Sequence, residues 1–499
     1  MKYLTLKIIG VFSLTLLWTA CTDKDYLDVN NDPNRVNDSN ITPELIFTQA
    51  AHAAGSSLTG SVSNFSSFIY NMVGYYSSTG DFALPGSETT YDYNPPFMDP
   101  TWSFYYNTLF DLTLAKRKAM ANGDSVLTGA SMILLAKIWQ DVVDMFGDVP
   151  FSEAFENDIT RKPRYDKASD IYNSLEKSLD TAIEFMGASP NSTFSSTDIV
   201  NHGDQGKWKK FANTLRLRLL IRQSEVAGFD PSAEITKIIN DGGVLHAGES
   251  ANVNPGYDNE TNKQNPYYGS WAFSPTGGDA APGERANVYI VNLLKSNNDP
   301  RLTRIFSPVN GSVVGCEYGL ASGNPTAPQA SKAGPGIAGN PSQDQWIIPS
   351  FESMFLEAEA IARGWMPGDA QAAYVNAVTE SFAWLGVPDP VNAAADYISN
   401  NAIANWSNSG TTALEKARFI ATQKYIAMTV IDPLEAWNDI RRLGILPDKG
   451  YLSVNPAKVS NTLPARYPYA QSEYVTNSEN VNIAAGNGNI FTSKIFWQP

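Results

Sequence analysis

Hydrophobic residues recur every three or four positions in several long stretches of the chain, the spacing that places them on one face of an α-helix. Residues 130–147 show this spacing, and Gly147 stands where such a helix would end. Residues 168–185 and 207–223 repeat the pattern. The pattern therefore predicts long helices in the first half of the chain.

A pair of helices is predicted in residues 350–364 and 369–386, joined by a short turn at Met366–Gly368. Small residues, among them Ala358 and Ala377, lie on the faces where these two helices would pack. Paired helices of this kind resemble tetratricopeptide repeats, although the consensus of that repeat is poorly kept. We predict a mostly α fold in which such helix pairs form a scaffold.

The stretches between the predicted helices show no helical spacing and are rich in Gly, Asn, Pro, Ser and aromatic residues. They are residues 186–205, 243–283, 307–349 and 445–499. Irregular stretches of this length in a compact protein are usually functional or disordered. Residues 255–273 are too aromatic for disorder. We therefore predict ordered loops that form a ligand-binding part on the helical scaffold.

The amino terminus has the layout of a secretory signal peptide. Lys2 and Lys7 flank the start of an apolar run, residues 8–18, which is shorter than the roughly 20 residues that span a bilayer. Small residues then come directly before Cys21, as in a bacterial lipoprotein, although Trp18 stands where that motif usually has Leu. We predict cleavage before Cys21 and acylation of its thiol. The alternative is an ordinary signal peptide followed by a coincidental cysteine.

The chain is predicted to divide into a signal peptide, a lipidated tether and a single helical body. These parts are residues 1–20, residues 21–40 and residues 41–499, with irregular insertions in the last near residues 243–283 and 307–349. The other cysteine is Cys316, so lipidation of Cys21 leaves no partner for an intramolecular disulfide. A chain of 499 residues can be stabilised by a large buried core instead.

Charge and composition narrow the classes of function. The chain carries 36 Lys and Arg against 51 Asp and Glu, a net charge of −15. Nucleic acids and anionic membrane faces bind basic patches, so we expect no nucleic acid as a partner. Charged residues make up only 17% of the chain, which also holds 11 Trp and 23 Tyr. This composition suits an exported protein that handles neutral polar ligands.

Four segments, in order along the chain, are similar to segments of one protein family. They are CTDKDYLDVNNDPN (21–34), WQDVVDMFGDVPFSEAF (139–155), QKYIAMTVIDPLEAWNDIRRLG (423–444) and LPARYPYAQSEYVTNSEN (463–480). Together they resemble the SusD/RagB family of nutrient-binding outer-membrane lipoproteins of Bacteroidetes. The last segment departs from the family pattern because Pro468 stands ahead of Tyr469. The resemblance extends over nearly the whole chain.

The resemblance implies four tetratricopeptide-like helix pairs packed against a loop-rich ligand-binding part. It also implies a partner, a TonB-dependent outer-membrane barrel (SusC-like), which such a lipoprotein covers as a hinged lid. Family members bind oligosaccharides and some bind peptides, and no cofactor is expected. The acidic residues after Cys21 look like the signal that sends such lipoproteins to the cell surface. We therefore expect a lipid-anchored protein, exposed at the surface of the outer membrane.

Several residues of the shared segments are expected to be structural. Trp437 should pack its helix against the core, while Arg441 and Arg442 pair with carboxylates of neighbouring segments. Arg466 and Glu473 are expected to serve the same end.

The helix predicted at residues 207–223 carries a run of basic residues, Arg216, Arg218 and Arg222. Such a run could form an anion site or a surface of ion pairs. We expect the salt-bridged surface.

The sequence gives little support for catalysis or metal binding. The histidines, His52, His202 and His246, are scattered and accompany no Ser or Cys motif, so neither a catalytic triad nor a zinc site is expected. Residues 28–39 begin like an EF-hand, but Pro33 replaces its required Gly. Paired carboxylates meet in space rather than in sequence, so the sequence singles out none. We predict no catalytic residue, no metal and no enzymatic activity.

Three groups of residues are the predicted ligand contacts, because Trp and Tyr rings can stack on the apolar faces of sugars. Family members can place a Trp on the ligand near the position of Trp102. The full set is Trp102 and Tyr105, then Tyr75, Tyr76 and Asp81, then Tyr267, Tyr268 and Trp271. Core packing, or contact with the barrel partner, would also explain these aromatic residues.

The function predicted from the sequence is capture of an oligosaccharide at the cell surface and its delivery to a TonB-dependent transporter. A peptide-capturing member of the same family is one alternative. A helical glycoside hydrolase is another, and it would release sugar where a binding protein would not. A scaffold without a small ligand is the third, and mutation of Trp102 and Trp271 would then leave uptake unchanged.

Overall fold

The computed structural model of the chain describes residues 41–57, 66–156, 160–189 and 194–499. The chain divides into two units, Met1–Thr42 and Pro43–Pro499. The fold described below is that of the second unit. The predicted signal peptide, the lipidation site Cys21 and the tether up to residue 40 lie outside the described residues.

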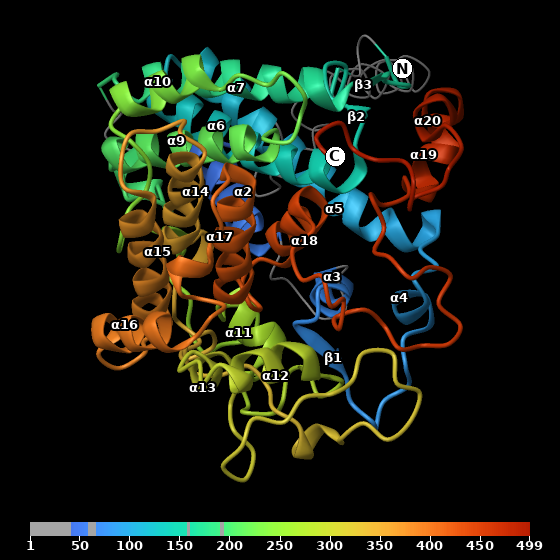
Figure 1. The fold of residues 1–499 in the computed structure, drawn as a ribbon. Helices are drawn as coiled ribbons and strands as arrows, with labels where there is room; N and C mark the ends of the chain where they lie inside the picture. The colour runs from blue at the N-terminus through green and yellow to red at the C-terminus, as the bar shows by residue number, and fades with distance from the viewer. Residues whose placement is uncertain (1–40, 58–65, 157–159, 190–193) are drawn as a thin grey trace, which may run out of the picture. The chain divides into compact units, whose positions relative to one another are not determined.

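Helices make up most of the regular structure, as Figure 1 shows. In chain order they are α2 (Pro43–Ser56), α3 (Ser66–Met72), α4 (Gly86–Thr90), α5 (Pro95–Ala121), α6 (Ser125–Phe146), α7 (Ala168–Phe185), α8 (Phe194–Thr197), α9 (Gln205–Arg222), α10 (Ser232–Asn240), α11 (Pro266–Trp271), α12 (Val288–Ser296), α13 (Leu302–Ile305), α14 (Ser350–Ala362), α15 (Ala370–Trp384), α16 (Pro390–Asn400), α17 (Ala413–Ala427), α18 (Pro433–Leu443), α19 (Gln471–Thr476) and α20 (Ser478–Ala485). The predicted mostly α fold is confirmed.

Helix α6 shows how the sequence sets the limits of an element. The Asp124 carboxylate accepts the Leu127 N–H at 2.9 Å and caps the first turn. At the other end Gly147 adopts a φ of 82°, which favours glycine, so the helix ends where the sequence predicts. Helix α6 is also the one candidate membrane span among the described residues. Because 94% of its apolar window is buried inside the protein, we interpret it as a core helix.

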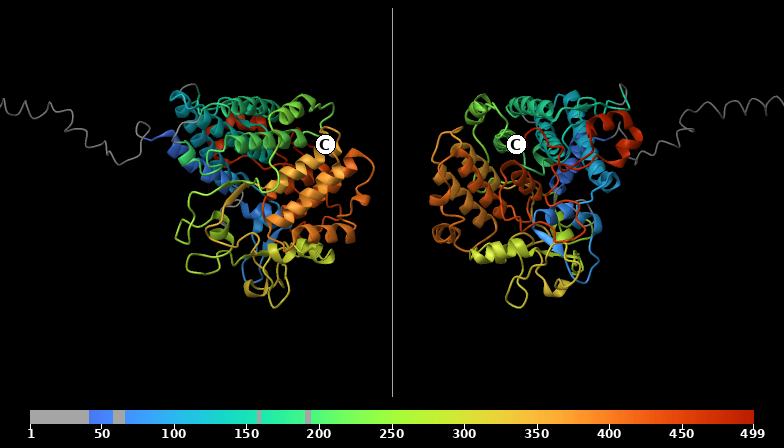
Figure 2. Two further views of the ribbon diagram at one scale, coloured as in Figure 1. Left: turned by 90° about the vertical axis from the view of Figure 1, so that its left-hand side faces the viewer. Right: turned by 45° about the vertical axis from the view of Figure 1, so that its right-hand side comes forward.

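The helices pack in pairs, α5 with α6, α7 with α9, α14 with α15, and α17 with α18. The predicted pair at 350–364 and 369–386 is confirmed as α14 and α15, which lie side by side with α17 in Figures 1 and 2. Asp369 begins α15 by accepting the backbone N–H groups of Gln371 (2.9 Å) and Ala372 (3.2 Å). This pairing is consistent with tetratricopeptide-like repeats.

Short antiparallel strand pairs connect the loops within the described residues. They are β1 (Tyr76–Ser78) with β5 (Glu284–Ala286), β2 (Val149–Pro150) with β3 (Tyr165–Asp166), and β4 (Ala251–Val253) with β6 (Gln345–Ile348). In the first pair Tyr76 lies opposite Ala286 and Ser78 opposite Glu284. Strands from distant parts of the chain therefore hold the predicted loop regions in place.

The prediction that residues 445–499 are irregular is wrong for α19 and α20. Only Val481 and Ala485 of these two short helices are buried, and Val475 (72% exposed) and Ile483 (76% exposed) face solvent. A helix that buries so few apolar residues leaves no periodic pattern for the sequence to show. Two short 3-10 helices, η3 (Ala327–Gln329) and η4 (Trp406–Asn408), also lie within loops.

The predicted salt-bridged surface on α9 is ion-paired but buried. Arg216, Arg218 and Arg222 are each at most 1% exposed. Arg218 pairs with Glu352 of α14 at 3.1 Å and with Glu435 of α18 at 2.9 Å. Helices α6, α7, α10 and α14 all pack against α9, so its arginines have no solvent to face.

Trp437 and Arg442 have the structural role that the sequence predicts. The predicted pairing of Arg441 with a carboxylate is wrong, because its guanidinium donates to the carbonyls of Ala465 and Asp144, at 2.7 Å each. Trp437 is fully buried, and the Arg441 guanidinium lies 3.6 Å from the centre of its ring. Arg442 donates two hydrogen bonds, of 2.6 and 2.8 Å, to the Glu359 carboxylate of α14. This fork ties α18 to α14.

Candidate functional site

Three predicted ligand residues from two distant parts of the chain meet in one aromatic cluster. The ring of Tyr76 in β1 stacks on that of Trp271 in α11, with centroids 4.8 Å apart and planes 7° from parallel. The hydroxyl of Tyr76 is hydrogen-bonded to that of Tyr267 at 2.7 Å. All three side chains are at most 2% exposed. They pack the loops onto the helices and present no surface to a ligand.

The three predicted residues Trp102, Tyr105 and Tyr75 are also buried. Trp102 is 5% exposed and stacks on Tyr106, with ring centroids 4.6 Å apart. Tyr105 is fully buried in α5, and the hydroxyl of Tyr75 donates to the Tyr425 carbonyl at 2.6 Å. The core-packing alternative therefore describes these residues in this structure, and their contact with a ligand stays a prediction.

Asp81 and Tyr268 are the predicted ligand residues that lie at the surface. Asp81 is exposed, and its carboxylate accepts the Ala327 N–H at 3.0 Å. A hydrogen bond from the Thr79 hydroxyl, and then this backbone bond, lower the pKa of Asp81. The Tyr268 ring is half-buried and lies 5.9 Å from that of Phe273.

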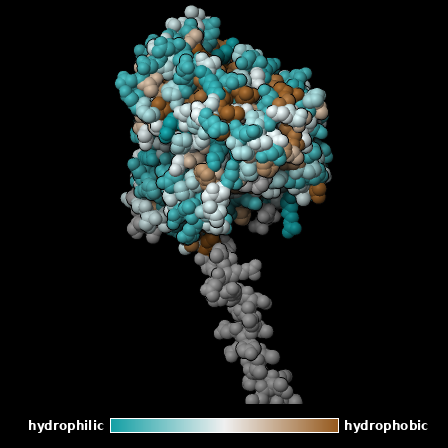
Figure 3. Space-filling model, turned by 90° about the horizontal axis from the view of Figure 1, so that it is seen from below, coloured by the Kyte–Doolittle hydropathy of each residue, from teal (hydrophilic) through white to brown (hydrophobic). Residues whose placement is uncertain are grey.

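We call the surface formed by residues 79–82, 261–285, 307–309 and 326–332 the loop surface. The aromatic cluster of Tyr76, Tyr267 and Trp271 lies beneath it. The face that carries α12, α13 and the loops is largely hydrophilic, with hydrophobic residues in scattered patches (Figure 3). Two hollows open in this region, and the turn of residues 273–279 contributes to both.

The first hollow, which we call the amide hollow, has a volume of about 420 Å³. Among its lining residues are His52, Ser56, Thr261, Asn262, Gln264 and Ser270. No Asp, Glu, Lys or Arg of the described residues lines it. Burial lowers the pKa of His52, so its imidazole is neutral at pH 7. The amide hollow therefore offers hydroxyl and amide groups without a net charge.

The second hollow, the charged hollow, has a volume of about 310 Å³. Asp279, Arg285, Ser307, Val309, Pro328 and Lys332 are among its lining residues. Arg285 is held in place by Asp279 and by the carbonyls of Ala327 (3.0 Å) and Ala281 (2.7 Å). The Lys332 ammonium lies 3.5 Å from the centre of the Phe273 ring. Burial lowers the pKa of Lys332, Asp279 opposes this effect, and Arg285 adds to it.

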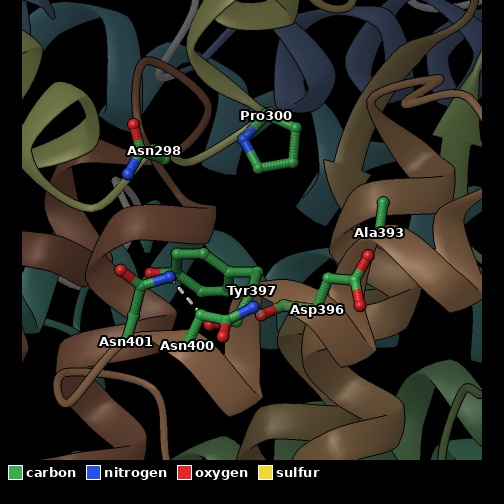
Figure 4. A pocket seen from close by; sticks show the side chains of 7 residues that line it. All are labelled: Asn298, Pro300, Ala393, Asp396, Tyr397, Asn400 and Asn401. Atoms are coloured by element: carbon green, nitrogen blue, oxygen red, sulfur yellow. Dashed lines mark hydrogen bonds between the residues drawn. The ribbon is translucent and has the colours of Figure 1, made fainter.

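A third hollow, of about 470 Å³, lies on one face of α16 and contains no predicted residue (Figure 4). Ala393, Asp396, Tyr397 and Asn400 line it at helical spacing, and Asn298 lies across from them. The Asn400 amide donates to the Asp396 carbonyl at 2.8 Å. This site offers hydrogen-bond acceptors but no exposed aromatic face, because the Tyr397 side chain is 4% exposed.

Among the described residues that line these hollows, the side chains form no arrangement typical of a catalytic site. Within the described ranges, no group of three or more His, Cys, Asp or Glu could hold a metal ion. The acids with the most raised pKa values near the loop surface are Glu88 and Glu284, linked through the amide of Asn71. Burial raises the pKa of Glu88 to about 7, and burial together with Glu88 raises that of Glu284 to about 8. Neither carboxylate lines any of the three hollows.

Sequence reasoning did not single out Lys332, Thr261 or Asn298. The segments around them, such as DNETNKQN (258–265), have the composition of ordinary polar loops. The one usable signal is their density of Asn and Thr beside aromatic residues. The charged hollow forms only when Asp279 and Arg285 meet residues 307–332 in space, which no local pattern shows.

Comparison with known proteins places the chain among relatives of known fold. Residues 33–470 match the sequence profile of the SusD-like family that is described as "Starch-binding associating with outer membrane". None of the curated proteins matches the sequence at a significant level.

Solved structures match nearly the whole chain at low sequence identity. A SusD/RagB family protein from Bacteroides thetaiotaomicron is 21% identical, with a TM-score of 0.73 over 92% of this chain and 99% of its own. A SusD-like protein from the same species is 23% identical, with a TM-score of 0.74 over 91% and 98%. A chitin-binding SusD homologue from Flavobacterium johnsoniae is 22% identical, with a TM-score of 0.72 over 90% and 98%.

Proposed function

The chain belongs to the SusD-like family, and from this we propose that it captures a nutrient oligosaccharide at the outer membrane and delivers it to a TonB-dependent transporter. The family description, starch-binding and associated with the outer membrane, supports both the class of ligand and the place. The chitin-binding homologue supports a glycan as the ligand, since it has the same fold. In this proposal the protein binds its ligand and breaks no bond.

The observation that carries the glycan proposal is the uncharged lining of the amide hollow. A neutral sugar presents hydroxyl groups that must exchange their hydrogen bonds to water for equivalent bonds to protein. Within the described residues, the side chains of Thr261, Asn262 and Ser270 line the hollow and make no hydrogen bond to the protein. Their hydroxyl and amide groups can therefore bind a ligand without breaking a hydrogen bond to the protein.

The membrane part of the proposal rests on the amino terminus. Cys21 after a signal-peptide pattern supports a lipid anchor. Each buried methylene contributes about 0.8 kcal/mol, so several acyl chains anchor a protein stably where one does not. The TonB-dependent barrel is the partner that would take the ligand from this surface.

Binding to a panel of neutral glycans, acidic glycans and peptides tests the proposal. The protein would carry Cys21→Ala so that it is soluble, and affinity would be measured by calorimetry. We expect binding of glycans without any release of shorter sugars. Sugar release that disappears when two carboxylates are replaced would favour the hydrolase, and binding of peptides alone would favour the peptide-capturing alternative.

Two variants locate the ligand. The double change Thr261→Val and Ser270→Ala removes two free hydroxyls from the amide hollow with little change in shape. We expect affinity to fall roughly thirtyfold, since the two lost hydrogen bonds contribute about 1 kcal/mol each. Asn400→Ala in the α16 hollow is the matched control. If only this control lowers affinity, the ligand binds on α16 and the assignment to the amide hollow is wrong.

The transporter is tested by purification of the tagged, lipidated protein in mild detergent. A TonB-dependent barrel at near-equal amount is the expected result. Its absence from well-solubilised membranes, with the anchor intact, would argue against delivery and for one of the alternatives.

A further inference from the structure

Lys332 is an unusual cation within the loop surface. Most buried or half-buried cations of the protein face carboxylates, as Arg218 and Arg442 do. Among the described residues, by contrast, the Lys332 ammonium donates no hydrogen bond and forms no ion pair. Its close neighbour is the ring of Phe273, whose centre is 3.5 Å away. A cation above a ring retains hydrogen-bonding capacity on its other side.

The second cation of the charged hollow does not compete for the same ligand. Arg285 is buried, and its N–H groups are committed to Asp279 and to the carbonyls of Ala327, Ala281 and Glu284. The Asp279 charge is therefore largely neutralised by Arg285, and Lys332 is left as the unbalanced charge of the hollow. This local positive charge occurs in a chain whose net charge is −15.

The surroundings favour a singly charged anion, such as a carboxylate, over a phosphate monoester, which carries up to two negative charges. Asp279 lines the same hollow, and Asp81 accepts the N–H of Ala327, another residue of its wall. Arg285 largely neutralises Asp279, but the Asp81 charge would still repel a dianion more strongly than a carboxylate. Val309 and Pro328 add apolar surface, which suits the C–H faces of a sugar ring.

We propose that Lys332 binds a carboxylate of the captured ligand, so that the natural ligand is a glycan containing an acidic sugar. This inference rests on the proposed function and narrows its ligand class. The charged hollow takes the acidic residue of the glycan, while the amide hollow takes neutral residues. The turn of residues 273–279, which contributes to both hollows, lies where the two parts of one ligand would join.

The test compares uronate-containing glycans with neutral glycans of the same length on a glycan array, followed by calorimetry of the best binders. With the soluble Cys21→Ala protein we expect uronate-containing glycans to bind at least tenfold more tightly. Lys332→Met keeps an unbranched side chain, shorter only by the terminal atom, and removes its charge. It should abolish this preference and leave the affinity for neutral glycans unchanged.

Lys177→Met is the matched control, since Lys177 is exposed on α7 and lines none of the three hollows. It should leave both affinities unchanged. Lys332→Arg, which restores a cation, should recover part of the preference for uronates.

Each outcome either supports the inference or overturns it. Neutral glycans that bind as well as uronates, or a preference that survives Lys332→Met, would overturn it while the proposed function stands. If no glycan binds at all, the proposed function fails as well. Peptides with a free carboxyl terminus form a further arm, alongside their amidated forms. A Lys332-dependent preference for the free peptides alone would show that the carboxylate comes from a peptide, which overturns the acidic sugar.

Discussion

At the scale of single residues, burial decides what a side chain can do. The carboxyl groups of Glu88 and Glu284, which are linked through Asn71, show how burial changes the charge that a side chain carries. Burial first, and then Glu88, raises the pKa of Glu284 to about 8, far above that of a carboxyl group in an unfolded chain. The folded protein therefore holds a proton that the unfolded chain releases. The contribution of this raised pKa to the free energy of unfolding is therefore largest at low pH and falls as the pH rises toward 8.

Replacement of Glu284 tests this linkage. Glu284→Gln keeps the shape and removes the titration, so the variant should lose less stability than the parent between pH 5 and pH 8. Burial raises the pKa of Glu88 as well, so the dependence of unfolding free energy on pH should become weaker in the variant but should not disappear. The midpoints of urea unfolding at three pH values measure this pH dependence for the parent and the variant. Glu479→Gln, on the exposed face of α20, is the control, and identical slopes for parent and Glu284→Gln would contradict the prediction.

The predicted ligand residues show what a single sequence can and cannot resolve. Tyr76 and Trp271 were predicted to contact ligand, yet they stack on each other in the core. Both roles need a large flat ring, so residue type cannot separate them. The partners stand far apart in the sequence, and no local pattern reveals the pair. Trp437 and Arg442 were predictable because they lie in a motif whose spacing places both on one helix.

At the scale of elements, capping residues fix where helices begin. Asp369 accepts two backbone N–H groups that would otherwise lack a partner in the first turn of α15. We expect Asp369→Ala to lower the free energy of unfolding by about 1 kcal/mol. Chemical denaturation measures this change. Asp396→Ala on α16 removes an exposed carboxylate that caps nothing, and an equal loss in both variants would argue against the cap.

Helices that pack against other helices were predicted well, and those that lie on the surface were not. Helices α6, α7, α14 and α15 have apolar residues at regular spacing because each buries a face. For α9 the existence of the helix was predictable but its environment was not. Its arginines are charged residues of a kind usually exposed, and only their partners on α6, α7, α10, α14 and α18 explain their burial.

At the scale of the whole molecule, buried ion pairs connect helices that are distant in sequence. Arg222 of α9 pairs with Asp144 of α6 at 3.1 Å and with Glu435 of α18. Arg222→Met leaves the buried Asp144 carboxylate without a cation, which costs about 3–5 kcal/mol, while Glu435 keeps its pairs with Arg218 and Lys424. Arg117→Met is the control, because its side chain is 46% exposed and its pair with Glu156 contributes about 0–1 kcal/mol. Similar losses of unfolding free energy in both variants would contradict this view.

The proposed anchor also acts on the whole molecule. Cys21→Ala should move the protein from the membrane fraction to the soluble fraction without change in its helical circular dichroism, since Cys21 lies outside the unit that carries the fold. Fractionation followed by immunoblotting measures this. A Cys21→Ala variant that stays in the membrane fraction would contradict the proposed lipid anchor.

The aromatic cluster under the loop surface has a consequence for calorimetry. Because Tyr76, Tyr267 and Trp271 are already packed, a ligand need not order the loops in order to bind. Coupled folding buries a large apolar area and gives a strongly negative heat-capacity change, whereas binding to a preformed surface does not. We therefore expect the binding enthalpy to vary little with temperature. A steep dependence on temperature would mean that the loops fold around the ligand.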